Sequence, residues 1–392
     1  MDYIFSDRIS SLKPSAIREI LKATSDPSVI PFAAGNPAPE AFPVDAIRAF
    51  TSDILNKSPL TALQYGISEG YTPLRDAVKK RACDRLHSLS DNDELIIVSG
   101  AQQGIELASK ILCNEGDVVI CEDPSFIGAL NAIRSYNVDL RGVPMTDGGI
   151  DTSRLEQTLA GCKNVKLMYL IPNYQNPTGI TMSLQKRREV YALAKKYGVM
   201  IIEDDPYHDI RFAGEELPTI KSMDTEGLVI YCGSFSKTLS AGLRVGFVIA
   251  PKPVIQKMIV AKQVSDVHTS MLPQMIAEKF LDEYDYDGHL KKIQAIYRHK
   301  ASLMLDGIKD HFDSRIEYTR PDGGLFLWCT LPEGTDVIDY VKRAAAAGVA
   351  AVPGSAFNAD PASPSRSFRL NYSTPTDAQI TRGMEILGGI KF

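Results

Sequence analysis

The residue whose surroundings best suit covalent chemistry is Lys237. It follows a β-rich run and lies within residues 233–246, a stretch of serines, glycines and other small residues with Arg244 seven positions after the lysine. Small side chains let a bulky anionic ligand approach the backbone closely. A lysine in such a pocket can form a Schiff base with a carbonyl cofactor. By itself, a lysine after a strand is more often a solvated loop residue, so the prediction depends on the small neighbours.

Polar residues follow two other apolar runs. Residues 203–205 (Glu-Asp-Asp) end one run, and residues 172–179 (Pro-Asn-Tyr-Gln-Asn-Pro-Thr-Gly) follow another. Ligands of open α/β sheets bind beyond the carboxyl ends of the strands, which makes both segments candidates for a binding site. The acids could equally be helix N-caps or surface groups, and Asn-Pro and Thr-Gly alone are typical of a turn.

The elements that must position these residues are short apolar strands alternating with helices. Helical periodicity is clear over residues 102–113 and 184–197, and Gly198 is a suitable stop for the second helix. Nearly continuous apolar strands between helices favour a mostly parallel sheet covered on both faces. The predicted strands are residues 95–98, 118–121, 167–171, 199–202, 228–231 and 245–249.

The pattern changes near residue 273. A long helical stretch over residues 274–311 is followed by mixed strands and helices, which indicates a smaller α+β unit. Before Pro43 the sequence predicts one short helix over residues 15–22 and then a stretch rich in Gly, Pro and Asn. The predicted elements after 311 are strands at 325–328, 349–353 and 366–371 and helices at 336–347 and 375–387.

Composition narrows the class of protein. The 392 residues carry a net charge of −5, so a broad nucleic-acid-binding surface is not expected. The start of the chain does not resemble a signal peptide, and the longest weakly polar run, 344–352, is too short for a membrane span. The six cysteines and six histidines are scattered without metal-ligand spacing. We therefore expect a globular cytoplasmic protein with free thiols, no metal, and neither nucleic acid nor membrane as a partner.

Taken together, these motifs identify a family resemblance. Ser-x-Ser-Lys at 234–237, Asn-Pro-Thr-Gly at 176–179, Asp-x-x-Tyr at 204–207, Arg244 and Arg369 occur in the order found in fold-type I, pyridoxal-phosphate-dependent aminotransferases of class I/II. The resemblance runs from about residue 13 to beyond residue 369. Within the family, the chain looks most similar to the 2-aminoadipate, kynurenine and aromatic multi-substrate aminotransferases, through residues 13–20, 63–66 and 261–269.

The resemblance implies a fold and its division. The fold would have a large domain with a mostly parallel seven-stranded sheet in an α/β/α sandwich, plus a smaller α+β domain. Residues 1–45 would be an N-terminal segment packing with the small domain and substrate site, 46–273 the large cofactor-binding domain, and 274–392 the small C-terminal domain. The active form would be a homodimer with shared active sites.

The resemblance also implies roles around the cofactor ring. Lys237 would form the Schiff base with pyridoxal 5'-phosphate and later move a proton, which requires a nearly neutral amine. Asp204 would face the pyridine nitrogen, with Asp205 as the competing choice. Tyr207 and Asn176 would bond the ring oxygen. The aromatic ring stacked on the cofactor would be that of Phe126.

The phosphate would bind where a strand gives way to a helix near residue 100, because free N–H groups at a helix start attract anions. The family often has a hydroxyl residue where this chain has Ala101, so one side-chain donor is lost. Tyr65 resembles the tyrosine that reaches the phosphate of the neighbouring subunit, although it could be a plain core aromatic residue. The remaining phosphate ligands would be Gly100, Gln102, Ser234, Ser236 and Arg244.

Substrate binding would centre on Arg369. An arginine inside an apolar strand is costly unless it is paired, and this one would bind the substrate α-carboxylate with help from Asn176. Gly35 and Asn36 would line the substrate mouth. Arg18 could bind a distal carboxylate, such as that of 2-aminoadipate, or could be a solvated helix residue beside Glu19.

The predicted function is the transfer of an amino group from an L-amino acid to a 2-oxo acid, with 2-oxoglutarate expected, in a ping-pong cycle. The donor could be aromatic, branched-chain or 2-aminoadipate-like. Another reaction on the same fold, such as a β-lyase or decarboxylase, is the nearest alternative. A non-enzymatic effector domain is a weaker alternative, because only about forty residues precede the large domain, where such proteins carry a DNA-binding unit. A nicotinamide dehydrogenase is also weaker, because no G-x-G-x-x-G follows the first strand.

Overall fold

The computed structural model describes residues 3–10, 12 and 28–391. Its largest element is an eight-stranded sheet in the order β1-β8-β7-β6-β5-β2-β3-β4. Neighbouring strands from β7 to β3 run parallel, whereas β8 is antiparallel to both β7 and β1. The strands are β1 (Asp93–Val98), β2 (Val118–Asp123), β3 (Asp139–Thr146), β4 (Gly149–Ile150), β5 (Val165–Leu170), β6 (Met200–Asp204), β7 (Val229–Ser234) and β8 (Gly246–Pro251).

The predicted mostly parallel sheet is confirmed. Its seven main strands are β1–β3 and β5–β8, and the eighth, β4, is a two-residue strand paired antiparallel with β3. The sequence did not predict β3, because half of its residues are exposed and it has no continuous apolar run. A strand this close to the edge of the sheet lacks the two-sided burial that makes central strands recognisable.

Side chains that alternate along the strands build a separate core on each face of the large sheet. On one face, Val119, Leu167 and Ile230 pack with helices α6 and α7. On the other face, Ile120 and Met168 pack with α8 and α9. The helices of these two layers are α6 (Ala101–Leu112), α7 (Ile127–Arg134), α8 (Thr152–Gly161) and α9 (Leu184–Tyr197).

Capping residues fix where several helices begin and end. The Ser183 side chain accepts a hydrogen bond from the backbone N–H of Lys186 at the start of α9, and Gly198, with a φ of +66°, ends the helix as predicted. The predicted long helical stretch is two helices, since Asp285 starts a new one. The other helices before residue 312 are α1 (Asp7–Ser10), α3 (Val44–Lys57), α4 (Pro59–Leu63), α5 (Thr72–Arg81), α10 (Lys252–Gln263), α11 (Met271–Asp282) and α12 (Tyr286–His311).

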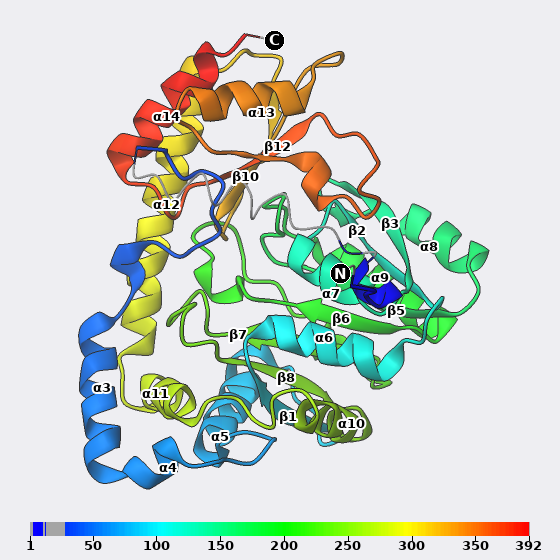
Figure 1. Cartoon of the computed structure of the whole chain (residues 1–392), viewed down its shortest axis with the longest axis vertical. Coiled ribbons are helices and arrows are strands. Elements are labelled where there is room, and N and C mark those ends of the chain that lie inside the picture. Colours follow the sequence, from blue (N-terminus) through cyan, green and yellow to red (C-terminus); the bar gives the residue numbers. More distant parts are fainter. Residues whose placement is uncertain (1–2, 11, 13–27, 392) are drawn as a thin grey trace.

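A second, four-stranded antiparallel sheet has the order β11-β12-β10-β9 and packs with α12, α13 and α14 at one end of the molecule (Figure 1). Residues 28–36 lie against it, and Ile30 bridges to Val349. Domain boundaries at 45/46 and 273/274 stay a prediction. The elements here are β9 (Glu317–Tyr318), β10 (Phe326–Thr330), α13 (Val337–Ala346), β11 (Val352–Pro353), β12 (Ser367–Asn371) and α14 (Asp377–Gly389).

Candidate active site

A cavity of about 400 Å³ lies beyond the carboxyl ends of β5, β6 and β7, between the large sheet and the second sheet. Thirteen of the residues singled out from the sequence line it, although they come from segments far apart in the chain. They are Gly35, Asn36, Ala101, Gln102, Phe126, Asn176, Asp204, Tyr207, Ser234, Ser236, Lys237, Arg244 and Arg369.

Three other residues named from the sequence are not among the lining residues. Gly100 lies at the edge of the cavity, directly against Arg244. Tyr65 is 82% exposed and its ring packs edge-on against His268, with 5.8 Å between ring centroids. It is therefore not the core aromatic residue that was the other possibility. Arg18 and the helix predicted for residues 15–22 lie outside the described residues.

Lys237 is partly buried just after β7, and its amine donates a hydrogen bond to the carbonyl oxygen of Gly35 at 2.8 Å. Burial lowers the pKa of this amine to about 8, and the positive charges of Arg369 and Arg244 lower it further in the same direction. The unprotonated form, which attacks a carbonyl carbon, is therefore more populated near neutral pH than it is for an ordinary lysine.

Asp204 ends β6 and is buried against the cavity. The hydroxyl of Tyr169, on β5, donates to its Oδ2 at 2.7 Å, while Oδ1 has no hydrogen-bond partner among the described residues. Burial raises the pKa of the carboxyl to about 7, although the Tyr169 hydrogen bond opposes the shift. A ligand that supplies an N–H at Oδ1 would satisfy this oxygen and hold the carboxylate in its charged form.

The start of α6 and the segment after β7 form the opposite end of the cavity. Gly100 has a φ of +80°, and a Cβ there would stand 2.3 Å from the Arg244 guanidinium. That guanidinium donates to the Ser99 carbonyl at 3.3 Å and lies 3.4 Å from the Ser236 hydroxyl. The unused N–H groups of the first turn of α6 and a cation thus converge, which is an arrangement suited to a phosphate.

Arg369 projects from β12 and is 3% exposed. It donates to Asn176 Oδ1 and to the Ala33 carbonyl, both at 2.8 Å, and its guanidinium lies 4.2 Å from the centroid of the Phe326 ring. Within the described part of the chain it has no carboxylate partner, and its Nε makes no hydrogen bond. Burying a cation without an anionic partner costs free energy, so a bound substrate carboxylate would stabilise this side chain.

Comparisons with known proteins show the family of the chain. The family model for aminotransferase class I and II matches residues 27–387. The chain belongs to the class I and II aminotransferases.

The relatives of this aminotransferase match it along nearly its whole length. Aromatic-amino-acid aminotransferase 1 of Thermococcus litoralis is 37% identical, over 99% of this chain and 94% of its own. The 2-aminoadipate transaminase of Thermus thermophilus is 36% identical, over 98% and 95%. The crystal structure of Pyrococcus horikoshii kynurenine aminotransferase, in complex with PMP and kynurenine, superposes with a TM-score of 0.94 at 35% identity, covering 98% and 96% of the two chains.

The described helices of this aminotransferase include none that is long and apolar enough to cross a bilayer. All six cysteines are free. Across the described ranges, no three His, Cys, Asp or Glu side chains gather as a metal site would require.

Tyr169 is a site residue of this aminotransferase that the sequence analysis missed. Its immediate neighbours on β5, Met168 and Leu170, are apolar, so it resembled one more core residue in the run 167–171. A buried tyrosine nevertheless needs a partner for its hydroxyl, and the carboxylate of Asp204 lies on the adjacent strand.

We expect Tyr169→Phe to lower kcat/KM about tenfold, because a hydrogen bond to a charged group contributes about 1.5 kcal/mol. Its loss also raises the pKa of Asp204, so the acid limb of the pH–rate profile should move to higher pH. The control is Tyr191→Phe, which removes a hydroxyl from Asp224 instead, far from the cavity. Equal effects of the two variants would contradict a specific role for Tyr169.

Proposed function

We propose that this aminotransferase binds pyridoxal 5'-phosphate in the cavity and moves an amino group from an L-amino acid to a 2-oxo acid by a ping-pong cycle. The observation that carries the proposal is the convergence of Lys237, Asp204 and Arg369 on one cavity: an amine with a lowered pKa, a carboxylate with an open oxygen, and an unpaired cation. These are the groups that transamination requires, within reach of a single ligand.

Two observations support the fit of this cofactor. The unpartnered Oδ1 of Asp204 calls for a donor such as a protonated ring nitrogen. At the other end, Gly100 leaves room for Arg244 beside the start of α6, where a phosphate would find both N–H groups and positive charge. The further groups available to the phosphate are Ala101, Gln102, Ser234 and Ser236.

When bound, pyridoxal phosphate supplies an electron sink for the charge that develops on the substrate Cα. Lys237 would hold the cofactor covalently and, once released, carry a proton to and from that carbon. Asp204 would keep the ring nitrogen protonated. Tyr207 and Asn176 would bind the ring oxygen, and Phe126 would cover one face of the ring.

Arg369 would bind the substrate α-carboxylate through its guanidinium, with Asn176 fixing the side-chain orientation at 2.8 Å. The carbonyl of Gly35 contacts the Lys237 amine, so this loop, together with Asn36, lies at the substrate end of the cavity. The amino donors that we infer are aromatic, branched-chain or 2-aminoadipate-like amino acids, with 2-oxoglutarate as the acceptor.

A transamination screen tests this function. The purified protein is supplied with pyridoxal phosphate and assayed with the common L-amino acids, 2-aminoadipate and kynurenine against 2-oxoglutarate. We expect amino transfer with parallel double-reciprocal plots. Release of pyruvate and ammonia from a cysteine conjugate without amino transfer would favour a β-lyase instead, and no turnover across the panel would contradict the proposal.

The screen also tests whether Arg18 contributes to specificity. A rate with 2-aminoadipate that falls in Arg18→Ala, while rates with aromatic donors do not, would support its binding of a distal carboxylate. An unchanged rate would remove that role.

We also infer a homodimer with shared active sites, and a cytoplasmic location consistent with the free thiols. An apolar surface surrounds Tyr65 on and after α4, where Leu60 is 82% exposed and Leu63 is 74% exposed. Through its contact with His268, Tyr65 lies beside the segment that follows α10, in which Val264 is 76% exposed. So much exposed apolar surface in one region is typical of a protein interface.

We expect Leu63→Arg to shift the protein from dimer to monomer in sedimentation velocity and to lower activity at least about tenfold, because a buried unpaired charge opposes association. The matched control is Ile338→Arg on α13, which Figure 1 shows at the opposite end of the molecule from α4. A Leu63→Arg variant that remains a dimer would contradict this interface.

A further inference from the structure

Asp204, the last residue of β6, and Asp205, which directly follows it, lie in different surroundings. Asp204 lines the cavity, whereas the side chain of Asp205 is fully buried behind it. Asp205 accepts hydrogen bonds from the Asn173 amide at 2.9 Å and from the Tyr231 hydroxyl at 3.1 Å. A second negative charge therefore lies directly behind the carboxylate that we assign to the cofactor ring.

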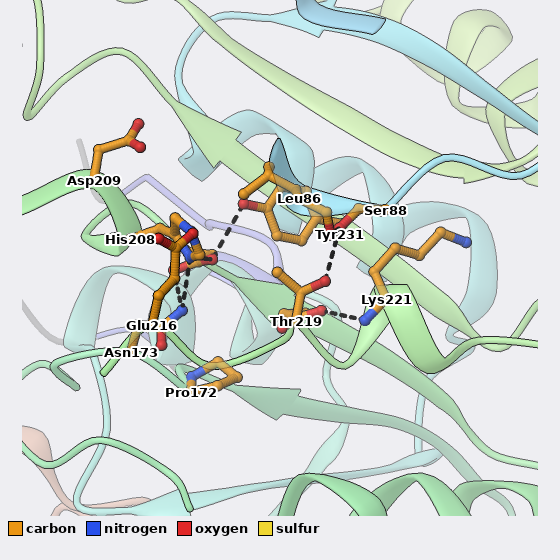
Figure 2. Close-up of polar contacts among 12 residues, drawn as sticks. Leu86, Ser88, Pro172, Asn173, His208, Asp209, Glu216, Thr219, Lys221 and Tyr231 are labelled. Atoms are coloured by element: carbon orange, nitrogen blue, oxygen red, sulfur yellow. Dashed lines mark hydrogen bonds and ion pairs between the residues drawn. The ribbon is translucent and has the colours of Figure 1, made fainter. Parts of the chain in front are cut away.

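His208 connects Asp205 to Glu216. Its Nδ1 is 3.3 Å from Asp205 Oδ2, its Nε2 is 3.0 Å from Glu216 Oε1, and its side chain is 11% exposed. Figure 2 shows His208, Glu216 and Asn173 gathered together, with Tyr231 beside them. Because each ring nitrogen faces a carboxylate oxygen, both nitrogens act as donors only in the imidazolium form.

The pKa of His208 agrees with this geometry. Burial disfavours the charged ring, but the hydrogen bonds and charges of Asp205 and Glu216 outweigh burial and raise the pKa to about 10. The pKa of Asp205 is lowered although burial opposes the shift, since the hydrogen bond and charge of His208 act on it. The two opposite shifts, together with the carboxylate oxygen beside each ring nitrogen, favour the ionised form of the pair.

Other charged groups around the pair do not replace His208. Asp209 adds negative charge near the ring, although it is paired with Arg81 and accepts a hydrogen bond from the Tyr286 hydroxyl. Arg187 forms no ion pair with Asp205: it donates a hydrogen bond to Asn173, whose amide nitrogen is also 3.4 Å from His208 Nδ1. The charge of Arg187 nevertheless helps to lower the pKa of Asp205, after the contributions of His208 and Asn173. The more distant cations that act on Glu216 are Arg211 and Arg85.

The protonation state of the His208–Asp205 pair affects the cavity through the charge of Asp205. After burial, the charge of Asp205 is among the causes that raise the pKa of Asp204. Loss of the imidazolium would leave that charge less compensated, because only Arg187 and the hydrogen bonds of Asn173 and Tyr231 would still act on it, and would strengthen the proton affinity of Asp204. His208 also follows Tyr207 directly in the chain. Its contacts with Asp205 and Glu216 therefore anchor the segment that carries Asp204 and Tyr207.

We propose that His208 is a positioning residue for the reaction: its imidazolium, held between Asp205 and Glu216, offsets the charge of Asp205 and keeps the Asp204 carboxylate ionised toward the bound cofactor. The proposal rests on the proposed function, which assigns Asp204 to the ring nitrogen. His208 itself touches neither substrate nor cofactor.

The test is a titration of the apo-protein with pyridoxal phosphate, followed by fluorescence quenching of its single tryptophan, Trp328. We expect His208→Gln to bind about tenfold more weakly, and His208→Lys, which keeps a cation, to stay within about threefold of wild type. The acid limb of kcat/KM in His208→Gln should move up by about one pH unit, because the ionised form of Asp204 is required. The control is His299→Gln, which removes an exposed hydrogen bond with Asp377.

A double variant tests the route of the effect. If His208 acts by offsetting Asp205, then Asp205→Asn together with His208→Gln should recover most of the lost affinity, since the charge to be offset is gone. If the double variant binds as weakly as His208→Gln, or if His208→Lys is as weak as His208→Gln, the charge argument is overturned. Unfolding midpoints of the apo-proteins identify misfolded variants. Glu216→Gln, which changes the outer carboxylate partner of His208, should weaken the binding of pyridoxal phosphate by only about threefold.

Failure of the function and failure of this proposal give different results. A wild-type protein that neither binds pyridoxal phosphate nor transaminates would contradict the proposed function itself. Tight binding by the wild type with unchanged affinity in His208→Gln would leave the function standing and reject the role of His208.

Discussion

Replacing Lys237 with alanine is expected to lower the rate of transamination by at least about 10⁴-fold, because the same amine would hold the cofactor and move the proton at the substrate Cα. The variant should also lose the absorbance band of the covalently bound cofactor. Borohydride treatment followed by mass spectrometry should label residue 237 in the wild type and nothing in the variant. Lys252→Ala, which changes an exposed lysine at the start of α10, should leave both measurements unchanged.

The pH dependence of cofactor attachment supplies a second measurement on the same residue. Since burial and two arginines lower the pKa of Lys237 to about 8, the reactive neutral amine increases as the pH rises through that value. The rate at which the wild-type apo-protein captures pyridoxal phosphate should therefore rise between about pH 6 and pH 9 and then level off. A rate that keeps rising toward the ordinary pKa of lysine would show that the amine is not perturbed. Borohydride-fixed cofactor in Lys237→Ala would show that another residue makes the bond.

The second large effect is expected at Arg369. Arg369→Gln should raise KM for both the amino acid and the 2-oxo acid, lowering kcat/KM by about 10² to 10³, because the variant loses a charge-assisted, two-point contact with a carboxylate. Arg369→Lys should recover only part of the loss, since a single ammonium cannot bind both oxygens in the same plane. The control is Arg366→Gln, an exposed arginine three residues earlier on the same segment.

Stability separates this binding role from a structural one. Arg369 is a buried cation without a carboxylate partner among the described residues, so removing its charge relieves a desolvation penalty. The unfolding midpoint of apo Arg369→Gln should therefore equal or exceed that of the wild-type apo-protein. A lower midpoint, together with an unchanged KM, would assign the residue to the fold and not to the substrate.

The central strands and the covalent chemistry could be predicted because their signals are local. The apolar runs 118–121 and 228–231 became β2 and β7, and the stretch around Lys237 carries its motif within a few residues. The break between α11 and α12 was not predicted, because the residues around Asp285 still look helical, and the N-cap hydrogen bond to Gly288 is seen only in the structure.

The support behind the site could not be predicted, because it depends on residues that meet only in the folded chain. Tyr169 and Asp204 are 35 positions apart, and nothing in the sequence shows that their strands are neighbours in the required register. His208 and Glu216 are closer in sequence, but an isolated histidine is most simply taken as a surface residue. Its two carboxylate partners became recognisable only when the burial of Asp205 was known.

Lys237, Arg244 and Arg369 lie around one cavity, and this arrangement makes the stability of the folded protein depend on bound anions. The folded chain holds these like charges together before any anion arrives, so each bound phosphate or carboxylate contributes to folding stability as well as to activity. Ligand at a hundredfold excess over its Kd adds about 2.7 kcal/mol to the free energy of unfolding. On the proposed binding of pyridoxal phosphate, we therefore expect the apo-protein to unfold at a lower temperature and to be degraded faster than the loaded protein, so that the abundance of the enzyme follows the supply of the cofactor.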